Sequence, residues 1–138
     1  MSRQIIVTLP VKSLEKSRAF FAGLGCSFKE QFCDHTAAWG MLSEQIHVML
    51  MTHQKFLEFS PPGTEICDTG KHTQVLFSLS CESRQEVDQL FVKAVESGAT
   101  TFEEAQDHGS MYGRSFQDLD GHGWQLLFME QAAQSSLD

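Results

Sequence analysis

The chain has 138 residues, of which 41% are hydrophobic and 20% charged, and its formal net charge is −8. This composition is typical of one globular domain with a buried core. The acidic balance, without any basic run, argues against a nucleic-acid partner, and no apolar run is long enough to cross a membrane. The start of the chain lacks the apolar stretch of a secretory signal, so we expect a cytoplasmic protein.

The four cysteines are spread along the chain, at Cys26, Cys33, Cys67 and Cys81, and no two of them form a CxxC pair. Each lies in an apolar or strand-like neighbourhood. This spacing favours reduced, buried thiols over a disulfide or a zinc cluster.

The first elements alternate between strand and helix patterns. Residues 4–11 show the period-two pattern of a strand, and Ser13 is placed to cap a helix that ends near Leu24. Gly25 then provides the left-handed residue that commonly terminates a helix. Three further strands are predicted after this helix, at Ser27–Cys33, Thr36–Leu42 and Ile46–Thr52.

The stretch His53–His72 has no regular pattern and contains Pro61-Pro62-Gly63, which breaks helices and strands. We expect it to be a linker without secondary structure. Its apolar residues, among them Phe56 and Phe59, indicate that it lies over a pocket rather than in free solvent.

The second half repeats the order of the first. Ser83, with Glu86 three positions later, has the pattern of a helix-starting capping box, and Gly98 closes the helix. The predicted strands of this half are Thr73–Ser80, Thr100–Glu103, Met111–Asp118 and Trp124–Glu130.

The predicted fold class is therefore α+β, with two βαβββ modules in one domain that spans residues 1–138. Module 1 covers residues 3–52, the linker residues 53–72, and module 2 residues 73–130. We expect the strands to form curled sheets around a central cavity.

Period-two alternation assigns the side chains of each strand to a face. In the first strand, Val7, Leu9 and Val11 are expected to face the helix. The side chains expected to face the cavity are Ile6, Thr8, Pro10, His47, Met49, Met51, Leu76, Ser78, Ser80, Gln125, Leu127 and Met129.

Two segments, LPVKSLEKSRAFF at positions 9–21 and DLDGHGW at positions 118–124, resemble the vicinal oxygen chelate superfamily, which includes glyoxalases, bleomycin-resistance proteins and extradiol dioxygenases. Within it, the chain is similar to an uncharacterised subgroup labelled as predicted lactoylglutathione lyases. The resemblance implies a small organic ligand and a homodimer.

Metal-dependent relatives in this superfamily place His or Glu on four strands. The matching positions in this sequence are Ile6, His47, Leu76 and Gln125. Aliphatic side chains cannot bind a cation, so two of the four ligands are missing, and we predict no metal cofactor. The alternative is a divalent metal such as zinc or nickel, held by His47, Gln125 and the loop residue His108.

The predicted ligand site contains polar and apolar side chains. His47 is either a general base or a neutral, hydrogen-bonded interior histidine. Gln125, Thr8 and Ser115 are expected to orient the ligand, and an apolar part of the pocket is expected at Trp39 and Met49.

Tyr112 and Arg114 are also candidate ligand contacts, because arginine binds carboxylate or phosphate groups through two hydrogen bonds. The alternative is a structural ion pair. Arg114 shares its side of the strand with Phe116, which favours the helix side, whereas Ser115 falls on the cavity side.

Three functions fit this sequence. The first is binding of a small molecule, or catalysis on it, without the inherited metal. The second is a metal-dependent lyase or dioxygenase. The third is sequestration of an antibiotic.

Overall fold

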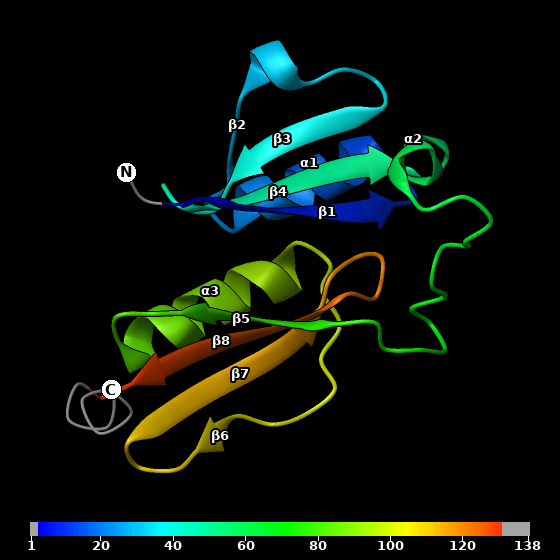
Figure 1. The fold of residues 1–138 in the computed structure, drawn as a ribbon. Helices are drawn as coiled ribbons and strands as arrows, with labels where there is room; N and C mark the ends of the chain where they lie inside the picture. The colour runs from blue at the N-terminus through cyan, green and yellow to red at the C-terminus, as the bar shows by residue number, and fades with distance from the viewer. Residues whose placement is uncertain (1–2, 131–138) are drawn as a thin grey trace. The chain divides into compact units, whose positions relative to one another are not determined.

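The computed structural model describes residues 3–130 and divides the chain into two compact units, residues 1–68 and 69–138. Each unit has a four-stranded mixed sheet that carries a helix, and neither sheet closes into a barrel (Figure 1). This confirms the predicted α+β class with two similar modules. The boundary between the units falls inside the predicted linker.

Unit 1 has the strand order β1-β4-β3-β2, in which β1 runs parallel to β4 and the other pairs are antiparallel. Its elements are β1 (Ile5–Val11), α1 (Leu14–Gly23), β2 (Ser27–Phe28), a 3-10 turn η1 (Glu30–Phe32), β3 (Ala37–Met41), β4 (Ile46–Thr52) and α2 (His53–Phe59).

Unit 2 repeats this topology with the order β5-β8-β7-β6, again with one parallel pair, β5 and β8. Its elements are β5 (Leu76–Ser80), α3 (Arg84–Glu96), β6 (Gln106–Asp107), β7 (Met111–Gln117) and β8 (Gly123–Met129). No helix in residues 3–130 is long and apolar enough to span a membrane.

Both long helices begin at the predicted serine caps. Ser13 Oγ accepts the backbone N–H of Lys16 at 3.2 Å, and Ser83 Oγ accepts the N–H of Glu86 at 3.0 Å. The Glu86 carboxylate accepts the N–H of Glu82 at 3.3 Å, one residue before the position that a capping box uses. Each helix is followed by its predicted glycine in the left-handed region, with φ of 92° at position 25 and 113° at position 98.

The core of each unit lies between the sheet and its long helix. In unit 1, the residues buried on this side are Leu9, Val11, Phe20, Phe21, Ala38, Val48 and Leu50. In unit 2, they are Val87, Phe91, Ala94, Phe116, Trp124 and Leu126. The strand residues in both sets follow the period-two alternation, because successive side chains of a strand point to opposite faces.

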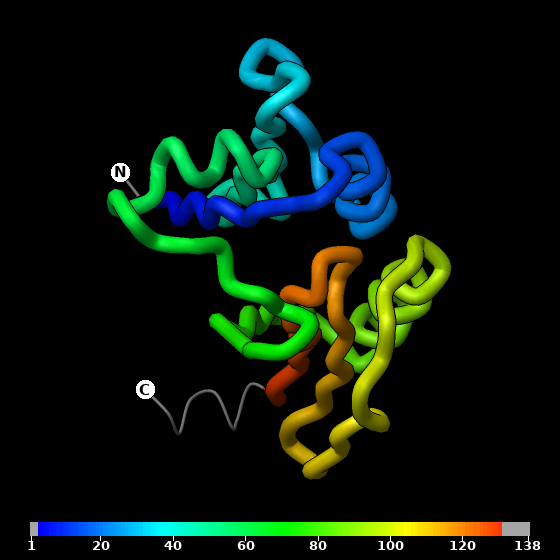
Figure 2. Tube along the Cα trace, turned by 90° about the vertical axis from the view of Figure 1, so that its right-hand side faces the viewer, coloured from blue at the N-terminus to red at the C-terminus, as the bar shows by residue number. Residues whose placement is uncertain are grey.

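The main difference from the predicted elements lies in the linker. Residues 53–59 form the helix α2, which contacts β1 and β4 (Figures 1 and 2). Thr52 Oγ1 caps this helix by accepting the N–H of Lys55 at 3.3 Å, and the helix stops before Pro61. The prediction of a linker without secondary structure is therefore wrong for its first seven residues.

Two predicted strands are shorter or displaced. The strand expected at Ser27–Cys33 ends at Phe28, because the 3-10 turn follows at once. The stretch predicted as a strand at Thr100–Glu103 makes only one bridge, between Thr100 and Gln117, and the edge strand is β6 instead.

None of the four cysteines forms a disulfide, and Cys26 and Cys81 are buried in the core. Burial raises the pKa of the Cys26 thiol to about 12, and burial together with the nearby Glu86 carboxylate raises the pKa of Cys81 to about 11. These two thiols therefore stay protonated and unreactive at neutral pH.

Gly40 leaves no room for a side chain in unit 1. A Cβ at this position would lie 2.5 Å from Cys26 Sγ and 3.0 Å from Phe28 Cε1. We expect Gly40→Ala to lower the free energy of unfolding by about 1–3 kcal/mol, because the added methyl overpacks a buried site. Urea unfolding followed by circular dichroism measures the change.

The double variant Gly40→Ala/Cys26→Ala is the matched control for this effect. It removes the sulfur that the new methyl contacts, so part of the lost stability should return. If the two substitutions were instead additive, Cys26 would not be the group that demands glycine here.

Candidate functional site

Each sheet has a face opposite its long helix, called here its open face. In unit 2, strand pairing places two consecutive rows of side chains on this face. The first row contains Leu76, Gly123 and Gln117, and the second contains Ser78, Gln125 and Ser115. The face assignments predicted for these residues from alternation agree with this register.

The first row borders a pocket of about 270 Å³ within unit 2. Its apolar lining includes Val75, Leu76 and Phe102, whose exposed fractions are 42%, 68% and 54%. Its polar lining includes the uncharged side chains of Thr69, Thr73, Gln74 and Gln117. Exposed apolar groups beside neutral hydrogen-bonding groups are typical of sites for small organic ligands.

One wall of the pocket is the turn that precedes β8, and a buried carboxylate fixes its shape. Asp118 is 5% exposed, and its Oδ1 accepts the N–H groups of Asp120 and His122, each at 3.0 Å. Its Oδ2 accepts Nε1–H of Trp124 at 3.0 Å. Burial raises the pKa of Asp118, although the neighbouring His122 and these hydrogen bonds oppose that change. Gly121, with φ of 85°, completes the turn.

The second row continues along the open face as a series of polar contacts. Ser78 Oγ donates to Gln125 Oε1 at 3.3 Å. Across the next strand, Ser115 is only 5% exposed, and its hydroxyl donates to Glu103 Oε1 at 2.9 Å. Glu103 comes from the loop before β6 and is not among the site residues predicted from the sequence.

Tyr112 and Arg114 point to the other side of the same sheet. The Tyr112 hydroxyl donates to Asp88 Oδ1 at 2.6 Å, and the guanidinium carbon of Arg114 lies 3.8 Å from the ring centroid of Phe91. Asp88 and Phe91 both belong to α3. Alternation along β7 turns Tyr112 and Arg114 toward the helix, which favours the alternative of a structural ion pair for Arg114 over contact with a ligand.

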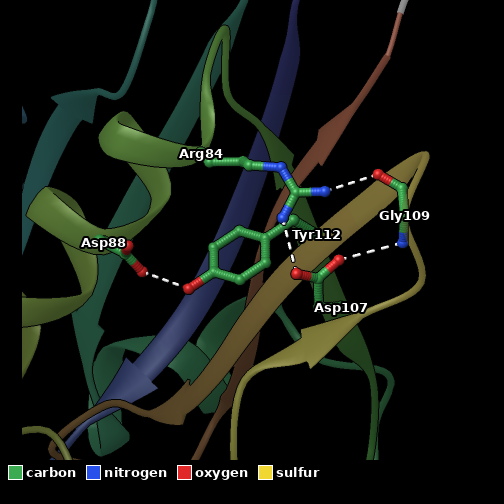
Figure 3. Close-up of polar contacts among 5 residues, drawn as sticks. All are labelled: Arg84, Asp88, Asp107, Gly109 and Tyr112. Atoms are coloured by element: carbon green, nitrogen blue, oxygen red, sulfur yellow. Dashed lines mark hydrogen bonds and ion pairs between the residues drawn. The ribbon is translucent and has the colours of Figure 1, made fainter.

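A second arginine braces the same region (Figure 3). Arg84 Nη1 donates to Asp107 Oδ2 at 2.8 Å, and Nη2 donates to the carbonyl of Gly109 at 2.5 Å. The hydrogen bond from Arg84 lowers the pKa of Asp107, and the hydrogen bond that Tyr112 donates to Asp88 raises the pKa of Tyr112. These contacts tie the start of α3 to the β6–β7 hairpin.

The open face of unit 1 contains the other predicted ligand contacts. Pairing places Thr8 and Trp39 on either side of Met49, all on one face. The centroid of the Trp39 ring lies 5.3 Å from that of Phe32, which is 54% exposed. The Lys29 amino group lies 4.6 Å from the centroid of the Trp39 ring. This face therefore has an aromatic surface within reach of solvent.

His47 is on the same face but is completely buried. Trp39 Nε1–H donates to His47 Nδ1 at 2.7 Å, and His47 Nε2 lies 3.0 Å from the carbonyl oxygen of Glu44. Indole can only donate and a carbonyl can only accept, so the ring is neutral with its proton on Nε2. Because both nitrogens are occupied, these contacts favour the hydrogen-bonded interior histidine over the general base.

The profile of the glyoxalase/bleomycin resistance protein/dioxygenase superfamily matches residues 4–126. The chain belongs to this superfamily. No curated protein matches it.

Solved structures share the fold across nearly the whole chain. A hypothetical protein from S. aureus is 29% identical, covers 93% of this chain and 95% of its own, and has a TM-score of 0.78. A fosfomycin resistance protein from Listeria monocytogenes is 16% identical, with coverages of 96% and 97% and a TM-score of 0.68. A lactoylglutathione lyase from Agrobacterium tumefaciens is 15% identical, with coverages of 93% and 94% and a TM-score of 0.66.

The donor groups of this superfamily member do not fit a divalent metal. Ile6 and Leu76 have aliphatic side chains that are 45% and 68% exposed, and both nitrogens of His47 are occupied. Across residues 3–130, no three His, Cys, Asp or Glu side chains gather into a possible metal site.

The alternative metal set is not assembled either. Within unit 2, His108 lies just before the turn that leads into Met111, the first residue of β7. Met111 is paired with Met129 of β8, and Gln125 lies four residues before Met129 in that strand. A strand rises about 3.3 Å per residue, so this separation is about 13 Å along the sheet. His108 and Gln125 cannot share one cation at that distance.

The structural role of His47 can be tested directly through its hydrogen bond with Trp39. We expect His47→Ala to lower the free energy of unfolding by about 2–4 kcal/mol, because it opens a cavity and leaves two polar groups without partners. We also expect a change in Trp39 fluorescence, measured in a Trp124→Phe background that removes the second tryptophan.

Exposed His35 is the matched control, and His35→Ala should change stability by less than about 0.5 kcal/mol. A His47→Ala protein as stable as the parent would show that the two hydrogen bonds are not structural.

Proposed function

We propose that this chain binds a small organic molecule on the open face of unit 2, without a divalent metal. The observation that carries the proposal is the 270 Å³ pocket beside the polar row of Ser78, Gln125 and Ser115. Ligand pockets commonly measure about 300–1,000 Å³, so this volume suits a compact ligand.

The lining indicates the chemistry of the ligand. Leu76 and Phe102 offer an apolar surface to a ring or an alkyl group, and burying such a group contributes about 25 cal/mol per Å². Gln117 and Gln125 are neutral amides on the same sheet face, and they suit a hydroxyl, amide or carbonyl group of the ligand.

In unit 1, Thr8, Trp39 and Met49 remain proposed ligand contacts. The partly exposed Trp39–Phe32 pair supports a role in binding an apolar or aromatic group. We assign His47 to holding the Trp39 indole in place rather than to contact with the ligand.

Two related functions are separable from metal-free binding by experiment. Lactoylglutathione lyase or dioxygenase activity of the metal-dependent kind needs a Lewis acid, and the donor groups described above do not favour one. Sequestration of an antibiotic uses the same binding without turnover. It would be favoured if resistance rose on overexpression while the drug stayed chemically intact.

Benzyl alcohol, which joins an apolar ring to a neutral hydroxyl, is a suitable first probe. We expect it to shift the backbone NMR signals of residues 76, 117 and 123, equally in chelator-treated and zinc-supplemented protein. Leu76→Trp fills the pocket from an exposed position. It should weaken binding at least tenfold, which corresponds to about 1.4 kcal/mol.

Val92→Trp, at an exposed site on α3, is the matched control and should bind the probe as the parent does. Binding that required zinc, or a purified protein with close to one equivalent of zinc or nickel, would contradict the metal-free proposal.

We also propose that the protein is a cytoplasmic homodimer. The dimer is supported by exposed apolar residues on the edge strands β1 and β5, where Ile5 is 58% and Leu76 is 68% exposed. Light scattering after size exclusion should give twice the mass of the chain, and the Ile5→Lys variant should shift this mass toward the monomer. A monomeric parent protein at micromolar concentration would contradict the proposal.

A further inference from the structure

One carboxylate reaches the open face of unit 2 from outside the sheet. Glu103 lies directly after Phe102, which lines the pocket, and its Oε1 accepts the Ser115 hydroxyl at 2.9 Å. Ser115 is paired with Gln125 in the neighbouring strand. Glu103 therefore places a negative charge next to the two neutral rows that form the proposed ligand site.

Within residues 3–130, no lysine, arginine or histidine side chain forms an ion pair with Glu103. The arginines Arg18, Arg84 and Arg114 are paired with Glu30, Asp107 and Asp88 instead. The Ser115 hydroxyl is its one hydrogen-bonding partner there. That bond orients one carboxylate oxygen and leaves further acceptor capacity on the group, because an ionised carboxylate offers about four lone-pair sites.

We propose that Glu103 selects ligands that carry a protonated amine. The inference rests on the proposed function, because it assumes that a small molecule occupies this pocket. A carboxylate can only accept hydrogen bonds, and its strongest partners are charged donors. Between the two common cationic donors, an ammonium group is more compact than a guanidinium, and this suits the 270 Å³ pocket.

The rest of the site fits an amine with an apolar body. Leu76 and Phe102 hold the apolar part, and the neutral Gln117 and Gln125 add no competing charge. An anionic ligand would be repelled by Glu103, and neither lysine nor arginine lines the pocket to offset this repulsion. Glu103 thus acts as the residue that determines specificity, with Ser115 as its positioning residue.

Two matched probes test the inference: benzylamine, which is protonated at neutral pH, and benzyl alcohol, its neutral counterpart. In NMR titrations at low salt, we expect the parent protein to bind benzylamine about tenfold more tightly than benzyl alcohol. This preference should fall toward onefold in Glu103→Gln and should decrease as sodium chloride is added, since salt screens exposed charges.

Two variants separate recognition from general charge and from structure. Glu104→Gln removes the same charge one residue away. Glu104 accepts a hydrogen bond from the Gln106 side chain through its backbone carbonyl, not through its carboxylate, so this variant should keep the preference. Ser115→Ala leaves the charge but removes its orienting hydroxyl, so the preference should drop to a value between those of the parent and Glu103→Gln.

The outcomes distinguish this inference from the function on which it rests. If neither probe shifts the signals of residues 76, 117 and 123, the proposed function itself fails. If both probes bind equally to the parent, or if Glu103→Gln keeps the preference, amine selection by Glu103 is overturned and the binding site stands. An equal loss in Glu104→Gln and Glu103→Gln would also overturn it, because the effect would then be general electrostatics.

Discussion

The packing of one long helix against only one face of each sheet is the constraint on which the rest of this structure depends. Successive side chains of a strand point alternately toward the helix and toward the open face. The register of a strand therefore determines which of its residues lie in the core and which lie at the proposed site. On β7, Phe116 and Arg114 pack toward α3, whereas Ser115 and Gln117 face the other way. A shift by one residue would exchange the two sets.

The buried polar groups share a second property: they are already hydrogen-bonded within the protein, which leaves them few donors or acceptors for a ligand. His47 uses both ring nitrogens, one toward Trp39 and one toward the carbonyl of Glu44. Asp118 accepts three hydrogen bonds from its own turn and from Trp124. Leaving such groups unpaired in the interior would be costly, so the fold satisfies them first. Groups available to a ligand are therefore found among the partly exposed residues.

Much of the fold could be predicted from the sequence because its signals are local. The caps Ser13 and Ser83, the left-handed glycines and the period-two faces each depend on neighbours within a few residues. The helix at 53–59 was missed because seven residues are too few for a clear helical period, and its cap, Thr52, is also the last residue of a strand.

The site was only partly predictable, because its contacts join residues that are distant in sequence. Alternation correctly placed Ser115 and Gln125 on one face, but it could not bring in Glu103, which lies 12 positions before Ser115 in a loop without period. Trp39 and His47 were both predicted as parts of the ligand site, but not the hydrogen bond between their side chains. Side-chain orientation decides that point, and strand parity does not fix it.

The position of charge on the open face supports the proposal that the ligand is an organic molecule and not a cation. A divalent metal needs several donors converging on one point, whereas Ile6 and Leu76 are aliphatic, and the Gln125 side-chain oxygen accepts from Ser78. The one carboxylate bound to the second row, Glu103, approaches from a loop instead of a central strand. A single acceptor at the side of an apolar pocket cannot enclose an ion. It can orient one donor group of a ligand whose remaining atoms bury the exposed leucine.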